Sequence, residues 1–337
     1  MNTSRLQAEQ YRKGILAGDR VVLAKAITLM ESTLPGDQQL AGQVLDTIIG
    51  DTGNSLRIGI TGAPGVGKST FIESFGKSLI LSGNRVAVLT IDPSSQVTGG
   101  SILGDKTRMQ ELARDPHAFI RPTASGHTLG GVASHTRETI LLCEAAGFDI
   151  VIVETVGTGQ SEVAVKNMVD FFLLLIQPGS GDELQGIKKG IVEMADAIVV
   201  TKADGPNINV ARATQADFQH AVHISGTQRP GWTLKVLTCS STDKNGLNEI
   251  MDTINLFREK LAESGYLAHN RKEQNLSWFK DYFLSLLSLD PARFIHVTAK
   301  EHALRSMISS SEISARNAAE QLLEAYHQAI RDSSPRP

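Results

Sequence analysis

The chain has 337 residues, more than one average domain, and its length predicts about two. With 41% hydrophobic and 20% charged residues, its composition excludes a mostly disordered or collagen-like chain. The net charge of −3 gives no basic excess for nucleic acid or an anionic membrane.

The apolar run Phe171–Ile176 is too short to cross a bilayer, and Met1–Gln10 lacks the apolar core of a signal peptide. Two cysteines make no disulfide framework. We therefore expect a soluble cytoplasmic protein.

The hydrophobic pattern divides the chain into three parts. Residues 1–55 carry two helical stripes, the first after a predicted N-cap at Asp19 and the second between Pro35 and Gly50. Residues 56–262 alternate short apolar strands with helix-length segments, which predicts an α/β fold with a mostly parallel sheet covered on both faces. The predicted strands are Arg57–Thr61, Val86–Ile91, Asp149–Glu154, Phe171–Ile176, Asp196–Thr201 and Lys235–Cys239.

Residues 263–337 are again predicted to be helical. One apolar stripe consists of Leu276, Phe279, Phe283, Leu286 and Leu287, and a second of Ala315, Ala319, Leu322 and Tyr326. The length of the chain is therefore interpreted as one α/β domain with a helical extension at each end, instead of two independent cores.

A phosphate-binding loop follows the first predicted strand. The run Gly62-Ala63-Pro64-Gly65-Val66-Gly67-Lys68-Ser69 matches G-x-x-x-x-G-K-[ST] and is followed by Thr70 and a helix-like segment. Glycines let backbone N–H groups turn toward the phosphates, and the helix N-terminus adds a favourable field. Lys68 is expected to bridge the β- and γ-phosphates, and the Ser69 hydroxyl to bind Mg²⁺. The alternative, a glycine-rich turn that matches by chance, is disfavoured by the strand–helix context.

Thr201-Lys202-Ala203-Asp204 follows a later strand and is a degenerate form of the guanine motif N-K-x-D. Asp204 could accept hydrogen bonds from guanine N1–H and the 2-amino group, which adenine cannot offer. Lys202 could lie along the base, and Ser240 could supply a contact to the base O6. The alternative is a solvated loop. Thr201 in place of Asn loses one amide contact.

Acidic residues at strand ends predict a magnesium site. Asp92 and Glu154 each end a predicted strand, and ligands of a doubly wound sheet lie at the carboxyl ends of strands. Two carboxylates, a hydroxyl and phosphate oxygens suit Mg²⁺. Gly157 can bring its N–H close to the γ-phosphate. Asp105, in a glycine-interrupted loop, could swing toward Mg²⁺ or the attacking water, with a solvated acid as the alternative.

A second glycine-rich loop, Gln177–Lys189, follows the strand Phe171–Ile176. It has the composition of a switch, but from the residues alone an ordinary strand–helix connection is favoured.

Taken in order, the segments TGAPGVGKST, LTIDPSS, TGGSILGDKTRM, RPTASGHTLGG, VIVETVGTGQSE, QPGSGDELQGIKKG and VVTKAD resemble the MeaB-type GTPases. This family includes the MMAA proteins and was also labelled as the ArgK arginine/ornithine transport ATPase. The resemblance covers nearly the whole chain and implies a P-loop NTPase fold of the SIMIBI type. It implies binding of GTP and GDP with Mg²⁺, and a homodimer formed by the C-terminal helices.

The resemblance also implies a chaperone of adenosylcobalamin-dependent methylmalonyl-CoA mutase that couples GTP hydrolysis to cofactor loading and protection. It puts Asp92, Asp105 and Glu154 at metal and switch positions, and Lys202 and Asp204 at the guanine base. It also replaces the interpretation of the loop 177–188 as an ordinary strand–helix connection, because this loop matches a switch that signals to the mutase in the family. Lys68, Asp105 and Glu154 are the expected catalytic residues.

Three other functions stay open. The first is an ATPase component for transport of basic amino acids, which would gain nothing from Lys202 and Asp204. The second is a metallocentre-maturation GTPase for nickel delivery, a class that commonly carries histidine tracts or cysteine–histidine ligands, which are not found in this sequence. The third is a P-loop kinase acting on a small molecule, against which the guanine-reading pair argues.

Overall fold

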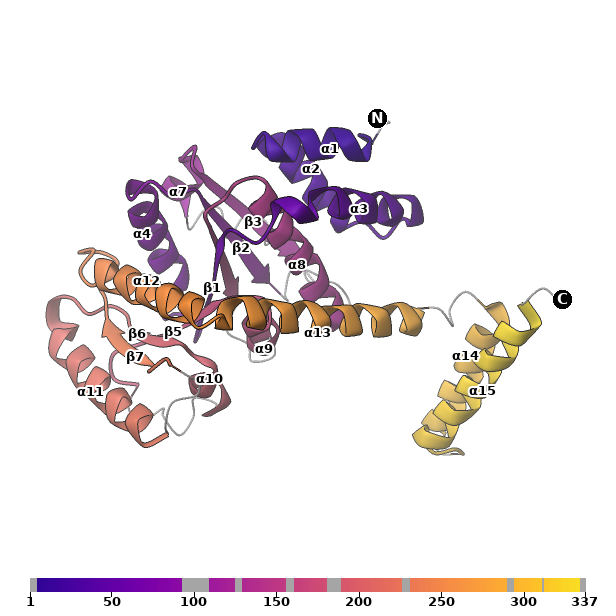
Figure 1. The fold of residues 1–337 in the computed structure, drawn as a ribbon. Helices are drawn as coiled ribbons and strands as arrows, with labels where there is room; N and C mark the ends of the chain where they lie inside the picture. Colours follow the sequence, from indigo (N-terminus) through magenta and orange to yellow (C-terminus); the bar gives the residue numbers. More distant parts are fainter. Residues whose placement is uncertain are drawn as a thin grey trace. The chain divides into compact units, whose positions relative to one another are not determined.

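The computed structural model describes residues 5–92, 109–124, 129–155, 161–180, 189–225, 231–289, 294–310 and 312–333 (Figure 1). Internal contacts divide the chain into two compact units, Met1–Asn275 and Leu276–Pro337. The first unit contains the sheet and the N-terminal helices, and the second contains most of the C-terminal helices.

The described part of the first unit is built on a seven-stranded parallel sheet of order β3-β2-β4-β1-β5-β6-β7. Since β1 lies between β4 and β5 and the chain crosses over β4 to reach β2, the carboxyl end of β1 is a topological switch point, where such sheets bind ligands. The strands are β1 Leu56–Gly62, β2 Val86–Asp92, β3 Ala118–Ala124, β4 Ile150–Thr155, β5 Phe171–Ile176, β6 Ala197–Val200 and β7 Lys235–Thr238.

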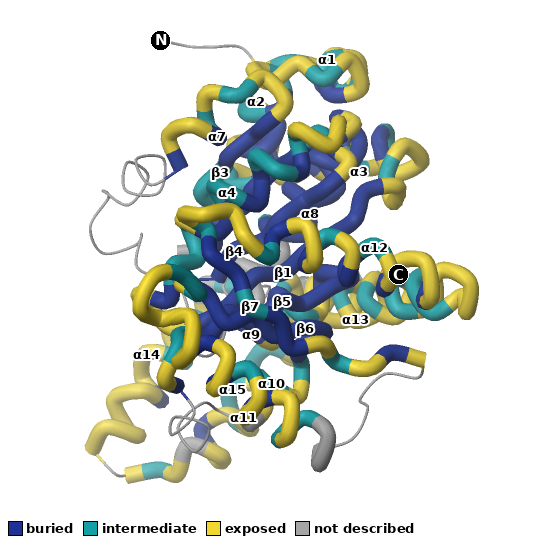
Figure 2. Tube along the Cα trace, turned by 90° about the vertical axis from the view of Figure 1, so that its left-hand side faces the viewer, coloured by how far each residue is buried: buried dark blue, intermediate teal, exposed yellow. Residues whose placement is uncertain are grey.

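Helices cover both faces of the sheet, and Figure 2 colours its strands as buried over most of their length. One face packs against α4 Lys68–Leu81, α7 Gln110–Arg114 and α12 Leu247–Glu263. The other packs against α8 Leu129–Ala145 and α9 Ser161–Lys166, and near β6 against α11 Ile208–Ser225. Alternate strand residues enter opposite clusters, which explains why these strands are apolar on both sides. The remaining elements are α10 Lys189–Met194 and the 3₁₀ turns Ile49–Asp51 and Gly205–Asn207.

The N-terminal helices α1 Ala8–Leu16, α2 Arg20–Met30 and α3 Pro35–Ile48 share a hydrophobic cluster with α8 and the sheet. The predicted cap at Asp19 is confirmed, because its carboxylate accepts hydrogen bonds from the backbone of Val21 and Val22. Pro35 occupies the first turn of α3, where a missing N–H costs nothing.

The six predicted strands are all present, and none of their ends differs from the prediction by more than one residue. Strand β3, which contains the pair Arg121-Pro122, was not predicted from the sequence. Proline has no N–H to donate, and β3 is tolerated because it lies at the edge of the sheet and pairs only with β2.

A buried network of ion pairs lies at the amino-terminal ends of β1 and β5. The Arg57 guanidinium donates to both oxygens of Glu144 at 2.8 and 2.9 Å. Arg271, near the start of α13 Tyr266–Leu289, donates to both oxygens of Asp170 at 2.8 and 2.6 Å and to the carbonyl of Ser55 at 2.6 Å. Asp170 also accepts from the backbone N–H of Arg57. These contacts fasten the first turns of α13 to the sheet.

In the second unit, α14 Ile295–Ser309 and α15 Ala315–Ser333 pack on each other. Val297, Leu304 and Ala318 are buried between them, and the Phe294 and Tyr326 rings meet edge to face at 5.9 Å. The apolar stripe on α13 is exposed, with 71% of Phe279 and 51% of Phe283 accessible. Within the described residues, no helix is both long and apolar enough to span a bilayer.

Candidate nucleotide site

The phosphate-binding loop connects the carboxyl end of β1 to the start of α4. Gly62, Gly65 and Gly67 have φ values of 153°, 81° and 98°, which side chains rarely allow. A Cβ at Gly62 would also lie 2.5 Å from the carbonyl oxygen of Leu175 on β5. These glycines therefore permit a loop that curls over the sheet with its backbone exposed to a ligand.

Lys68 is the first residue of α4, and Gly67 is its N-cap. The Lys68 ammonium donates to the carbonyl oxygens of Gly62 at 2.7 Å and Ala63 at 3.2 Å. The cation therefore lies inside the curl of the loop, at a helix N-terminus, and both features attract an anion.

The side chain of Ser69, in the first turn of α4, meets that of Glu154, near the carboxyl end of β4. The Ser69 hydroxyl donates to Glu154 Oε1 at 3.3 Å, and Glu154 is only 7% exposed. Next to this pair, Thr155 donates to Thr61 at 2.8 Å, which ties β4 to β1. A hydroxyl and a carboxylate at this point are hard oxygen donors of the kind that Mg²⁺ prefers. The donor set fits this ion.

Lys202 and Asp204 lie in the loop after β6. Lys202 has a φ of 54°, uncommon for a residue with a side chain, and its ammonium donates to the carbonyl of Gly65 at 2.8 Å. The Lys202 side chain therefore reaches the phosphate-binding loop. Asp204 Oδ2 accepts from the hydroxyl of the fully buried Ser240 at 2.6 Å. This bond fixes the carboxylate between the loops after β6 and β7.

The structure gives Thr201 and Ser240 roles that were not predicted from the sequence. Thr201 Oγ1 lies 2.8 Å from the carbonyl of Val66 and 3.1 Å from that of Ile176, so it joins the phosphate-binding loop to the end of β5. The backbone N–H of Ser240 donates to Asn245, and its side chain positions Asp204. Beside it, burial raises the pKa of the Cys239 thiol to about 12.

Several predicted residues lie outside the described part of the chain. These are Asp105, Gly157, residues 181–188 of the second glycine-rich loop, and the side chain of Asp92, whose backbone ends β2. Among the side chains that are described, no group of three or more His, Cys, Asp or Glu residues gathers around a common point. The sheet does bring together the phosphate-binding loop, Glu154, Lys202 and Asp204, from β1, β4 and β6.

A parallel sheet with a phosphate-binding loop at its switch point, and a lysine and aspartate beyond it, defines a P-loop NTPase. The family model described as methylmalonyl Co-A mutase-associated GTPase MeaB matches residues 23–289. The chain therefore belongs to the MeaB family of P-loop GTPases, which bind guanine nucleotides.

Three similar proteins support this placement. GTPase ArgK of Escherichia coli is 52% identical over 81% of this chain and 82% of its own length. The mouse methylmalonic aciduria type A homolog, a mitochondrial protein, is 48% identical over 79% of this chain and 66% of its own. The crystal structure of a LAO/AO transport system kinase superposes with a TM-score of 0.75 at 37% identity, and the match covers 96% of this chain and 100% of that one.

Proposed function

We propose that this GTPase acts as a chaperone of adenosylcobalamin-dependent methylmalonyl-CoA mutase. GTP binding and hydrolysis would be coupled to loading of the cofactor into the mutase and to protection of the loaded enzyme. The observation that carries the proposal is the match of the mutase-associated family model over residues 23–289, which includes the phosphate-binding loop and the Lys202–Asp204 loop.

In the proposed nucleotide site, residues 62–70 bind the phosphates. The Lys68 ammonium would exchange the carbonyl oxygens of Gly62 and Ala63 for the β- and γ-phosphates, where it offsets the negative charge that develops during hydrolysis. Asp204 would accept hydrogen bonds from the guanine N1–H and 2-amino group, and the Lys202 stem would lie against the base. Ser240 holds the Asp204 carboxylate, which reduces the entropy lost on binding.

We propose that Ser69 and Glu154 hold Mg²⁺, with Asp92 and Asp105 as further ligands. The distance of 3.3 Å between Ser69 Oγ and Glu154 Oε1 supports this assignment, because one ion could contact both oxygens. Bound Mg²⁺ would supply charge neutralisation at the phosphates. Glu154 and Asp105 are proposed to orient the attacking water, and Gly157 to sense the γ-phosphate through its N–H.

Residues 177–188 are proposed as the switch that signals to the mutase, and the C-terminal helices as the contact between two copies of the chain. Hydrolysis is expected to be slow for the isolated protein and faster with its partner, because the groups that orient the attacking water would reach their final positions only when the partner binds.

The direct test uses purified mutase and the full chain loaded with GTP, GDP or no nucleotide. We expect a complex on gel filtration whose amount depends on the nucleotide, together with a GTPase rate raised by the mutase. A protein that hydrolyses GTP at full rate alone, and neither binds nor responds to the mutase, would contradict the proposal.

One alternative is favoured by a specific observation, the similarity of this chain to the crystal structure of a transport system kinase. An ATPase role in basic amino-acid transport would require ATP to bind as tightly as GTP, and this binding would persist in Asp204→Ala. A competition experiment with labelled GDP against ATP and GTP separates the two functions. A metallocentre-maturation GTPase would instead bind nickel in equilibrium dialysis.

A further inference from the structure

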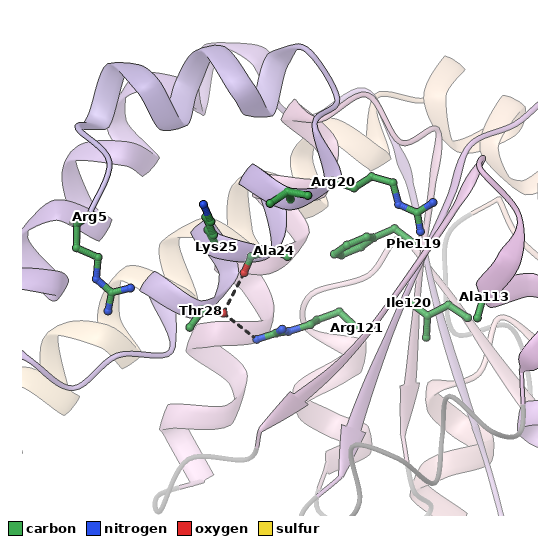
Figure 3. A pocket seen from close by; sticks show the side chains of 10 residues that line it. Arg5, Arg20, Ala24, Lys25, Thr28, Ala113, Phe119, Ile120 and Arg121 are labelled. Carbon is green, nitrogen blue, oxygen red and sulfur yellow. Dashed lines mark hydrogen bonds between the residues drawn. The ribbon is translucent and has the colours of Figure 1, made fainter. Parts of the chain in front are cut away.

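A cavity of about 560 Å³ lies beside the edge strand β3 (Figure 3). The charged ends of Arg20 and Lys25, which both line it, point apart in this view. Arg5 and Arg121, also in the lining, are each paired with a carboxylate. Among the described residues, the cavity therefore offers no pair of cations that converges on one ligand.

The loop after β7, residues 239–246, lies in the nucleotide site at the other side of the sheet and is closed by its own hydrogen bonds. The Ser240 backbone N–H donates to the carbonyl of Asn245 at 3.0 Å, and the Asp243 N–H donates to Ser240 Oγ at 2.9 Å. The Ser240 hydroxyl in turn donates to Asp204 Oδ2 at 2.6 Å. The position of the Asp204 carboxylate therefore depends on the position of this loop.

Contacts with β6 and with α4 fix the loop in the first unit. Next to β6, the Cys239 N–H donates to the carbonyl of Val200 at 2.8 Å, and the Ala203 N–H donates to the carbonyl of Cys239 at 3.0 Å. From α4, the Ser74 hydroxyl donates to the carbonyl of Ser241 at 2.8 Å. The loop is therefore held at its start by a strand and further along by a side chain of the helix.

Helix α4 is also the helix that begins at the phosphate-binding loop. Ser69, in its first turn, meets Glu154, and Ser74 lies five residues further on, about 7.5 Å along the helix axis. Between them, Phe71 and Ile72 are fully buried in the cluster that joins α4 to the sheet. One well-packed helix thus holds the phosphate side of the site through its first turn and the base side through its second.

This arrangement matters for the base because hydrogen bonds weaken steeply when their angle is poor. Guanine offers two donors to Asp204, the N1–H and the 2-amino group, and both reach the carboxylate only when it lies at the correct place relative to the bound phosphates. A loop that can shift relative to α4 would weaken these two bonds and leave the phosphate contacts intact.

We propose that Ser74 is a positioning residue for guanine selection. By holding the Ser241 carbonyl it fixes the loop 239–246, and through Ser240 the Asp204 carboxylate, relative to the phosphate-binding loop. Ser74 acts through these residues and is assigned no contact with the nucleotide. The inference rests on the proposed role of Asp204 at the base.

The test measures the affinities of the full chain for GDP, IDP and ADP by competition with a fluorescent GDP analogue. IDP lacks the 2-amino group, and ADP lacks both groups that Asp204 accepts from. For Ser74→Ala we expect the ratio of GDP to ADP affinities to fall about three- to tenfold, the range of one hydrogen bond. The ratio of GDP to IDP affinities should also fall, and the ADP affinity should change less than about twofold.

Two variants of α4 serve as controls. Ser74→Thr keeps the hydroxyl and should restore both ratios to within about twofold of the parent. Ser78→Ala removes a hydroxyl one turn further along, which forms no hydrogen bond within the described part of the chain, and should leave all three affinities unchanged. The Tm of each variant checks that it folds.

A double variant distinguishes positioning from general damage to the helix. If Ser74 acts through Asp204, adding Ser74→Ala to Asp204→Ala should not lower the ratio of GDP to ADP affinities further. An equal loss of affinity for all three nucleotides in Ser74→Ala, or a further fall of the ratio in the double variant, would overturn the proposal. An unchanged ratio in Ser74→Ala alone would overturn the role of Ser74, whereas an unchanged ratio in Asp204→Ala would overturn the role of Asp204 as well.

Discussion

Lys68 is the residue on which the phosphate chemistry depends most directly. Its ammonium is already held inside the loop by the carbonyls of Gly62 and Ala63, so little rearrangement is needed to reach a phosphate. Lys68→Ala removes this charge, and we expect the GTPase rate to fall at least about a hundredfold. The measurement is phosphate release with Lys260→Ala as a control. Activity within a factor of two of the parent would rule out the role proposed for Lys68.

Asp204 is expected to determine the preference for guanine. Its carboxylate is held by Ser240 and would lose both hydrogen bonds to the base if replaced by alanine. Asp204→Ala should weaken GDP binding about ten- to a hundredfold while ATP binding changes little, since each of the two hydrogen bonds contributes a net of about 0.5–1.5 kcal/mol. Ser240→Ala should show the same change to a smaller degree. The check is fluorescence competition with both nucleotides, and an unchanged ratio of affinities would contradict the assignment.

The two cysteines should be chemically inert in the folded protein. Both are buried, and burial raises the pKa of Cys239 to about 12 and that of Cys143 still further. Because the thiolate is the reactive form, neither should react with a disulfide reagent at pH 8 within minutes. Two thiols should be titrated after denaturation in guanidinium chloride. Rapid labelling of the native protein would indicate that the loop after β7 opens.

At the level of single residues, the sequence predicts those that belong to local motifs and misses those whose role depends on long-range contacts. Lys68 and Ser69 are found because the motif specifies both the residue types and their spacing. Thr201 was read only as a substitution in the guanine motif. Its bonds to Val66 and Ile176 join residues 135 and 25 positions apart, and no pattern in the chain indicates them.

The elements were predicted best where they are buried on both faces. Strands such as β5 are continuous apolar runs, and the sheet around them requires such runs. Strand β3 was missed because Arg121 and Pro122 interrupt its pattern, and only its edge position makes them acceptable. The N-terminal helices were predicted from their stripes, but their packing on α8 depends on residues about a hundred positions away.

The start of α3 contains a pH-sensitive contact. The Arg5 guanidinium, followed by the Ser32 hydroxyl, holds the pKa of Asp37 below its ordinary value of 3.8. A lowered pKa means that the contact stabilises the folded state at neutral pH, and that this stabilisation is lost as the pH falls through the folded pKa. Asp37→Asn should therefore lower the Tm at pH 7, and its difference from the parent should narrow below about pH 4.

The matched control for this helix is Asp46→Asn, an exposed change on α3 that should leave the Tm and its pH dependence close to those of the parent. A difference between Asp37→Asn and the parent that stays constant down to about pH 2.5, or grows, would show that the ion pair with Arg5 is not the cause.

At the scale of the whole molecule, the exposed stripe on α13 predicts association. The Phe279 and Phe283 rings stack with centroids 6.4 Å apart, and both are more than half accessible in the single chain. Such a surface is typical of an interface. We expect a dimer by light scattering, and a monomer for Phe279→Glu/Phe283→Glu. Lys280→Glu, on the same helix but outside the stripe, should remain dimeric. A dimer that persists in the double variant would place the interface elsewhere.

The ion pair between Arg271 and Asp170 determines whether α13 can respond to the bound nucleotide. It holds the first turns of this helix at the amino-terminal ends of β1 and β5, whereas the phosphate-binding loop follows the other end of β1. The seven residues of β1 separate the two by about 23 Å. Since β1 is hydrogen-bonded on both sides and covered on both faces, it cannot slide to carry a signal. The first turns of α13 therefore keep the same position whether or not a nucleotide is bound. A partner that binds these turns binds the protein in every nucleotide state. A partner whose binding depends on the nucleotide must contact the other end of the strands, at their carboxyl termini.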